Sequence, residues 1–156
     1  MYDVIEQTTT RTSGRSRVIG WSLRVVTAAA LAVDAFVHVD LAGRYDANQG
    51  TGPLSQGDLF RIEAVVSGLA ALALLISGRW LVWLVAWLVA VSAVGAVLLY
   101  RYHDPGELGP LPDMYEPFWF REKSAATLAE GVAVLTATAG LLEEWWHRRA
   151  VRAASG

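Results

Sequence analysis

The stretch WLVWLVAWLVAVSAVGAVLLY, residues 80–100, decides the fold of this chain, because it carries no charged side chain anywhere along its length. A helix rises 1.5 Å per residue, so about twenty apolar residues match the ~30 Å hydrocarbon core of a bilayer. A soluble domain instead spaces its apolar residues at a helix or strand period. The stretch therefore predicts a helix that crosses a membrane.

Three further stretches share this character: residues 18–41, 59–77 and 124–142. The chain as a whole is 54% hydrophobic and 18% charged, with the apolar residues gathered in these blocks. A cleavable signal peptide is the alternative for the first block, but such a segment tolerates Arg24, Asp34 and His38 poorly. We therefore expect an all-α, polytopic membrane protein whose four transmembrane helices form a bundle.

The segments outside the spans complete the layout of a single transmembrane domain, residues 17–150. Residues 1–16 are polar and rich in Arg and Thr, which predicts a disordered tail, and residues 151–156 form a second tail. Two outer loops, residues 43–58 and 101–123, join the spans. The second is rich in proline and aromatic residues, so we expect it to form a stiff lid over the outer mouth, with Pro117 opening the fourth helix.

Basic residues near the span ends predict the orientation. Cytoplasmic loops of membrane proteins carry an excess of Lys and Arg. One side of the predicted bundle carries Arg11, Arg15, Arg17, Arg79, Arg148, Arg149 and Arg152, whereas acidic residues outnumber basic ones on the other. Arg makes up nearly all the cations, and Ala and Val are abundant, which is typical of GC-rich bacteria. We expect a multi-pass protein of the bacterial cell membrane with both termini in the cytoplasm.

Three of the spans place a carboxylate inside the hydrocarbon region: Asp34, Glu63 and Glu130. Such a residue costs about 3 kcal/mol at mid-bilayer, and by default it faces the bundle interior. At 1.5 Å per residue, all three lie at one level in the outer half of the membrane. Three carboxyl groups that meet in a low dielectric cannot all ionise, so they must hold protons, find cations or bind a metal ion.

A histidine one helical turn outward from Asp34 completes the candidate site. The ligand- or proton-binding candidates are Asp34, His38, Glu63 and Glu130, with Tyr100, Arg101 and His103 as an upper rim. The first four offer nitrogen and oxygen ligands for zinc, manganese or iron, so a metal ion is the candidate cofactor. Haem is disfavoured, because His38 is the only histidine within a span. The alternatives without a ligand are purely structural. Asp34 and His38 could form a pair that fixes the helix register, and His103 could be a solvent-exposed side chain of the loop.

Several classes of function find no support in the sequence. The absence of cysteine excludes disulfides, thiolate zinc sites and iron–sulfur clusters. A net charge of −2 with dispersed cations gives no reason to expect nucleic acid as a partner. Gly-x-Ser-x-Gly, His-Glu-x-x-His and Walker patterns are absent, so a non-enzymatic role is favoured over hydrolase or NTPase chemistry.

Three stretches, DAFVHVDLAGRYD (34–46), LSQGDLFRIEA (54–64) and GPLPDMYEP (109–117), resemble a group of small actinobacterial four-helix integral membrane proteins. The resemblance covers about residues 20–140 and implies the topology and little else. In outline the chain is also similar to DoxX-type four-helix proteins, which are associated with quinone-linked or thiol redox systems, although no motif is shared.

Three functional hypotheses follow. The first is an outward-facing carboxylate and histidine pocket that binds a proton, a metal ion or a small polar ligand, with protonation coupled to binding. The second is an accessory or assembly subunit of a larger membrane complex, a respiratory one for example, that packs through Ala86, Ala90, Ser92 and Ala96. The third is a DoxX-like redox component. Because four spans are few for a transporter, we expect a homo-oligomer or a larger complex in the lipid bilayer.

Overall fold

The computed structural model describes the backbone of residues 2–154 and the side chains of residues 18–153. Its helices are α1 (Tyr2–Ala42), a short 3-10 helix η1 (Gly43–Tyr45), α2 (Gln56–Ile76), α3 (Trp80–Tyr102) and α4 (Arg121–Ala154). Four of these are long and apolar enough to cross a membrane. The predicted all-α, four-helix architecture is confirmed. The backbone of residues 2–16, where a disordered tail was expected, continues α1 as helix, and the side chains of this segment lie outside the described residues.

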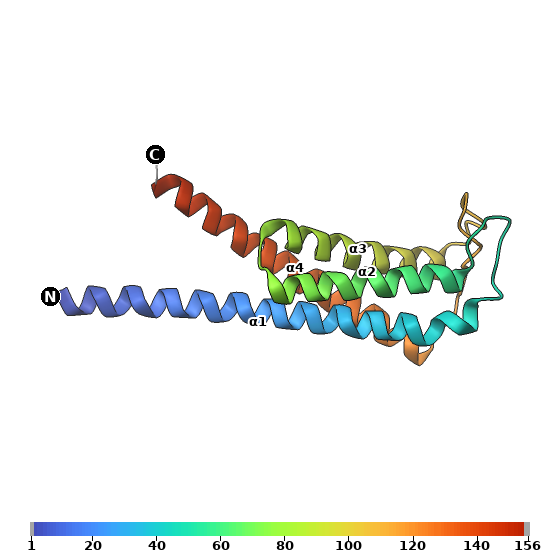
Figure 1. Ribbon diagram of the computed structural model, residues 1–156, viewed down its shortest axis with the longest axis horizontal. Coiled ribbons are helices and arrows are strands. Elements are labelled where there is room, and N and C mark those ends of the chain that lie inside the picture. Colours follow the sequence, from blue (N-terminus) through green and yellow to red (C-terminus); the bar gives the residue numbers. More distant parts are fainter. Residues whose placement is uncertain (1, 155–156) are drawn as a thin grey trace.

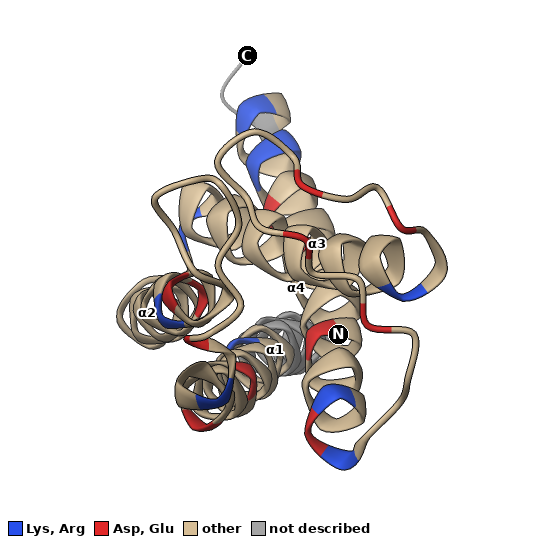
Figure 2. Ribbon diagram, turned by 90° about the vertical axis from the view of Figure 1, so that its right-hand side faces the viewer, with Lys and Arg blue, Asp and Glu red and all other residues tan. Residues whose placement is uncertain are grey.

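The four long helices run alternately up and down and close into a ring (Figure 1). α1 packs against α2 and α4, and α3 completes the ring with its more extensive contact on α4 and a smaller one on α2. α1 begins and α4 ends at the same end of the bundle, beside the turn between α2 and α3. Both long loops lie at the opposite end, which Figure 2 faces, and charged residues there occupy the loops and the nearest helix turns.

Two apolar clusters fill the interior, one above the other. The cluster nearer the chain ends contains Leu31, Leu74 and Trp83, packed among alanines of α1 to α4. The cluster nearer the loops consists of Val37, Leu41 and Ala126, against which Tyr45, Phe60 and Phe120 pack. Small residues let the helix backbones approach closely, which is the usual means of packing helices in lipid.

The small residues of α3 that were expected to face a partner complex are used within the chain. Ala86 and Ala90 belong to the cluster nearer the chain ends and are 0% and 1% exposed. Ser92 and Ala96 are exposed and border a cavity, described below. Half of the surface suggested for the accessory-subunit hypothesis is therefore buried within the chain, and the hypothesis itself stays a prediction.

Three helices begin elsewhere than predicted, and α1 begins at Tyr2, well before the span expected from residue 18. α2 begins at Gln56 rather than 59, because Ser55 and Asp58 form a capping box: Ser55 Oγ accepts from the Asp58 amide (3.0 Å), and Asp58 Oδ2 accepts from the Ser55 amide (3.1 Å). α4 begins at Arg121, so the expectation that Pro117 opens it was wrong. The preceding segment is instead held at the top of the bundle, where the Glu116 amide donates to the Tyr100 carbonyl (3.0 Å).

Side-chain hydrogen bonds fix α1 against both of its neighbours. Arg24 Nε donates to the Leu74 carbonyl (2.7 Å), so a cation stabilises the negative end of α2. Thr27 Oγ1 donates to Thr136 Oγ1 (2.7 Å), which joins α1 to α4. These contacts set the height of α1 relative to α2 and α4, and with it the level at which Asp34 meets the other helices.

The close approach of α3 and α4 generates the first prediction. A Cβ added at Gly140 would lie 2.6 Å from ring atoms of Trp83, which is 3% exposed and has little room to move. Overpacking of this kind costs about 1–3 kcal/mol, so Gly140→Ala should lower the Tm of the purified protein in detergent. Gly131→Ala on the same helix is the matched control, because its Cβ would meet nothing within 4 Å. Equal Tm values for the two variants would contradict this packing.

Candidate functional site

A layer of polar side chains separates the two apolar clusters. Asp34 of α1, Ser67 of α2 and Glu130 of α4 are each 1% exposed or less. His38, one turn outward from Asp34, has a side chain that is 12% exposed, and Glu63 on α2 is partly buried. The acids thus face the interior at one level, in agreement with the helical spacing in the sequence.

Asp34, His38 and Glu130 form the tightest part of this layer. One ligand atom from each of the three residues lies within 4.8 Å of the other two, so the group could hold a metal ion. His38 Nδ1 is 3.0 Å from Asp34 Oδ1 and also 3.0 Å from the backbone oxygen of Asp34. Nδ1 donates to the backbone oxygen, and its contact with Oδ1 is an ion pair only when the imidazole is protonated.

Three carboxylate oxygens of this group have no hydrogen-bond partner among the described residues: Asp34 Oδ1 and both oxygens of Glu130. Buried polar atoms are nearly always paired, and an unpaired one costs free energy comparable to a lost hydrogen bond. Hydrogen bonds from the described residues therefore leave these three oxygens unpaired, and a proton or a cation would balance their charge.

Ser67 connects Asp34 to the fourth predicted site residue, Glu63. Its Oγ lies 2.7 Å from Asp34 Oδ2 and 3.0 Å from Glu63 Oε1. A hydroxyl has one hydrogen to donate. Ser67 therefore donates its hydrogen to one of these oxygens or shares it between the two. The structure thus brings three of the four predicted ligands within metal-binding reach, and Glu63 joins them through a hydroxyl.

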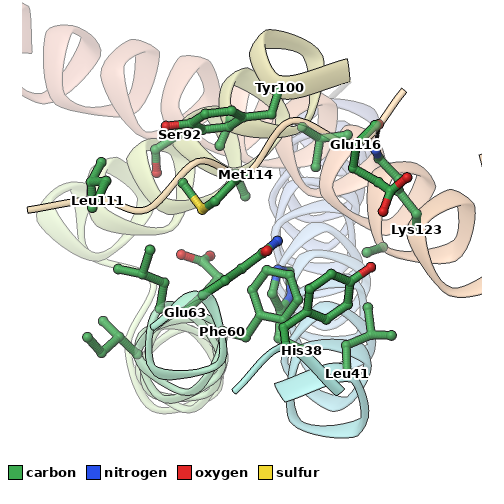
Figure 3. Close-up of a pocket in the computed structure, with 18 of the residues that line it drawn as sticks. His38, Leu41, Phe60, Glu63, Ser92, Tyr100, Leu111, Met114, Glu116 and Lys123 are labelled. Atoms are coloured by element: carbon green, nitrogen blue, oxygen red, sulfur yellow. Dashed lines mark hydrogen bonds between the residues drawn. The ribbon is translucent and has the colours of Figure 1, made fainter. Parts of the chain in front are cut away.

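A cavity of about 350 Å³ lies on the loop side of this layer (Figure 3). All four helices and the long outer loop line it, and most of its lining side chains are apolar. His38 and Glu63 border it at its inner end, and Figure 3 shows Glu63 pointing into it. Lys123 and Glu116 border it on the α4 side. His38 therefore belongs both to the buried group and to the cavity wall.

The long outer loop covers this cavity, as its composition predicted. Leu111, Met114 and Glu116 contribute to the lining, and the loop crosses the mouth in Figure 3. Lys123 Nζ donates to the Glu116 carbonyl (2.6 Å), and Asn48 Nδ2 of the first loop donates to the Asp113 carbonyl (2.9 Å). The first loop and α4 thus hold the cover in place.

The three expected rim residues take different positions. Tyr100 borders the cavity and is 7% exposed. The guanidinium of Arg101 lies over the rings of Tyr102 and Trp119, at 5.0 and 5.8 Å from their centres. His103 follows the end of α3 and is exposed. Arg101 and His103 lie outside the cavity lining.

Fold and site together define a class: a four-helix bundle, built to cross a membrane, with a buried Asp–His–Glu group beneath a covered cavity. The sequence matches no protein-family model, no curated protein and no solved structure. The chemistry of the site therefore carries the functional argument.

A carboxylate in the long loop ties the two outer loops together. Glu107 Oε2 accepts from the backbone amide (3.1 Å) and from Oγ1 (2.6 Å) of Thr51. These hydrogen bonds favour the ionised form and hold the pKa of Glu107 below its ordinary value. The contact is therefore complete above the ordinary pKa of a glutamate, and it is lost as the pH falls through the lowered pKa of the folded protein.

This contact predicts a titration that NMR can follow in nanodiscs. The chemical shift of the Thr51 amide proton should titrate with a midpoint below that of an unperturbed glutamate, and Glu107→Gln should abolish the titration. Asp104→Asn, in the same loop, is the control, because Asp104 accepts from Gly106 instead (3.2 Å). A Thr51 titration that persists in Glu107→Gln would show that another group is responsible.

Proposed function

We propose that this membrane protein binds a divalent transition-metal ion at Asp34, His38 and Glu130, and that binding is coupled to proton release. The observation that carries the proposal is the convergence of three ligand atoms within 4.8 Å, in a group three of whose four carboxylate oxygens are buried and lack hydrogen bonds. A divalent cation would compensate the buried negative charge of this group.

The donor set favours one class of metal. One imidazole nitrogen and two carboxylate oxygens suit zinc, manganese or iron(II), whereas calcium and magnesium prefer oxygen ligands alone. Three protein ligands leave a coordination position for water or an exchanging ligand. The cavity beside His38 gives that position a route to the loop end of the bundle.

Proton coupling follows from the same geometry. Carboxyl groups and imidazole must lose their protons to bind a metal, so binding competes with protonation. Ser67 joins Asp34 to Glu63, and Glu63 borders the cavity. The side chains of Ser67 and Glu63 therefore offer a path from Asp34 to the cavity for the displaced proton. The excess of arginine at the opposite end supports placing the cavity on the outer face of the bacterial membrane.

Zinc binding to the purified full chain in detergent tests the proposal. We expect one Zn²⁺ per chain, measured by equilibrium dialysis and elemental analysis. Asp34→Asn and Glu130→Gln should weaken binding by about 100-fold or more, because losing even an outer-shell partner costs about 10–100-fold. Asp40→Asn is the matched control, since its side chain is 47% exposed and pairs with Arg44. Unchanged affinity in Asp34→Asn, or no bound zinc, manganese or iron in the wild type, would overturn the proposal.

Calorimetry in buffers of different protonation enthalpy tests the proton coupling separately. Zinc binding should release about one proton or more, and the affinity should rise with pH because protons compete for the same atoms. Ser67→Ala should keep the stoichiometry and slow the exchange of protons with the cavity. Zinc affinity that is independent of pH would contradict proton coupling and leave the metal site itself standing.

A further inference from the structure

The cavity offers a second binding site, which adjoins the buried metal group at His38. It occupies about 350 Å³, within the range of small-molecule sites in proteins, which are mostly apolar with a few fixed polar groups. Its apolar wall includes Leu59, Phe60 and Val97, and the polar groups at its inner end are His38 and Glu63. This arrangement suits a molecule with an apolar body and one polar head.

The wall between α2 and α3 indicates where such a molecule enters. Ile62 on α2 is 51% exposed, and Ser92 and Ala96 on α3 are exposed, yet all three line the cavity. These positions lie within the membrane-spanning segments of both helices. Leu111 and Met114 of the outer loop cover the end toward water. The cavity is thus open on its bilayer side and covered on its aqueous side.

The charges at the inner end select the head group. Glu63 borders this end and is joined through Ser67 to Asp34, so a second carboxylate placed there would face like charges. The two basic side chains of the lining already have partners: Lys123 donates to the Glu116 carbonyl (2.6 Å), and His38 Nδ1 lies 3.0 Å from Asp34 Oδ1. A hydroxyl, in contrast, can donate a hydrogen bond to the Glu63 carboxylate and accept one from other groups.

We infer that the cavity binds a single-chain amphiphile with an uncharged hydroxyl head, which enters from the bilayer between α2 and α3 and places its head against Glu63 and His38. The body of the molecule then fills the space between Phe60, Val97 and the covering loop. This site does not require the metal ion, and it shares only His38 with the proposed metal group.

A photoreactive alcohol tests this inference on the full chain in nanodiscs. The probe is a decanol that carries a diazirine near the end of its chain, added to protein stripped of metal with a chelator. Labelling should fall on α2 and α3 beside the cavity, and unmodified decanol should compete for it. Decanoic acid should compete poorly. Labelling spread evenly over the lipid-facing surface, or equal competition by the acid, would overturn the inference.

Variants that fill the cavity provide the matched comparison. Ala96→Trp and Ser92→Trp should each abolish site-specific labelling, whereas Leu88→Trp, on the lipid-facing side of the same helix, should leave it intact. Glu63→Leu should reduce decanol affinity by about tenfold to 100-fold, the value of one hydrogen bond to a charged group. Full labelling in both cavity-filled variants, at normal Tm, would contradict the assignment. Because metal is absent throughout, this result is independent of the zinc titrations.

Discussion

The burial of carboxyl groups inside a membrane-spanning bundle is the constraint on which the rest of the structure depends. Asp34 and Glu130 are almost completely removed from solvent, and lipid cannot compensate them. The helices must therefore meet at one level and supply each other's partners. The alanines that flank Glu130 on α4 allow this approach: Ala126 and Ala133 are 4% and 0% exposed. Arg24 and the Thr27–Thr136 contact hold the register.

The two sides of the polar layer differ, and that difference shapes the function. Toward the chain ends, Leu31, Leu74 and Trp83 pack tightly and close the bundle. Toward the loops, the cavity reaches His38 and Glu63 under a cover held by Lys123 and Asn48. A site that opens only toward the loops suits binding and release of a ligand at the loop end of the bundle. Passage across the membrane would require the tight cluster to open as well.

Hydropathy and helical spacing predicted the four spans and the common level of the acids, because both depend only on residue order along each helix. They missed the start of α2, where the capping box of Ser55 and Asp58 outweighs the polar character of residues 56–58. They also missed the start of α4, because tertiary contacts of the outer loop set it. The bridging role of Ser67 and the stacking of Arg101 depend on side-chain directions that spacing does not determine. The cavity depends on the small size of Ser92 and Ala96, which the sequence suggested as a contact surface for a partner.

X-ray absorption spectroscopy of the zinc-loaded protein tests the central claim most directly, because it reports the atoms around the metal. The account predicts a mixed shell of nitrogen and oxygen at about 2.0–2.2 Å, with the outer scattering of one imidazole that disappears in His38→Gln. An all-oxygen shell, or imidazole scattering that survives in His38→Gln, would show that zinc binds elsewhere and that the buried group of Asp34, His38 and Glu130 is not its site.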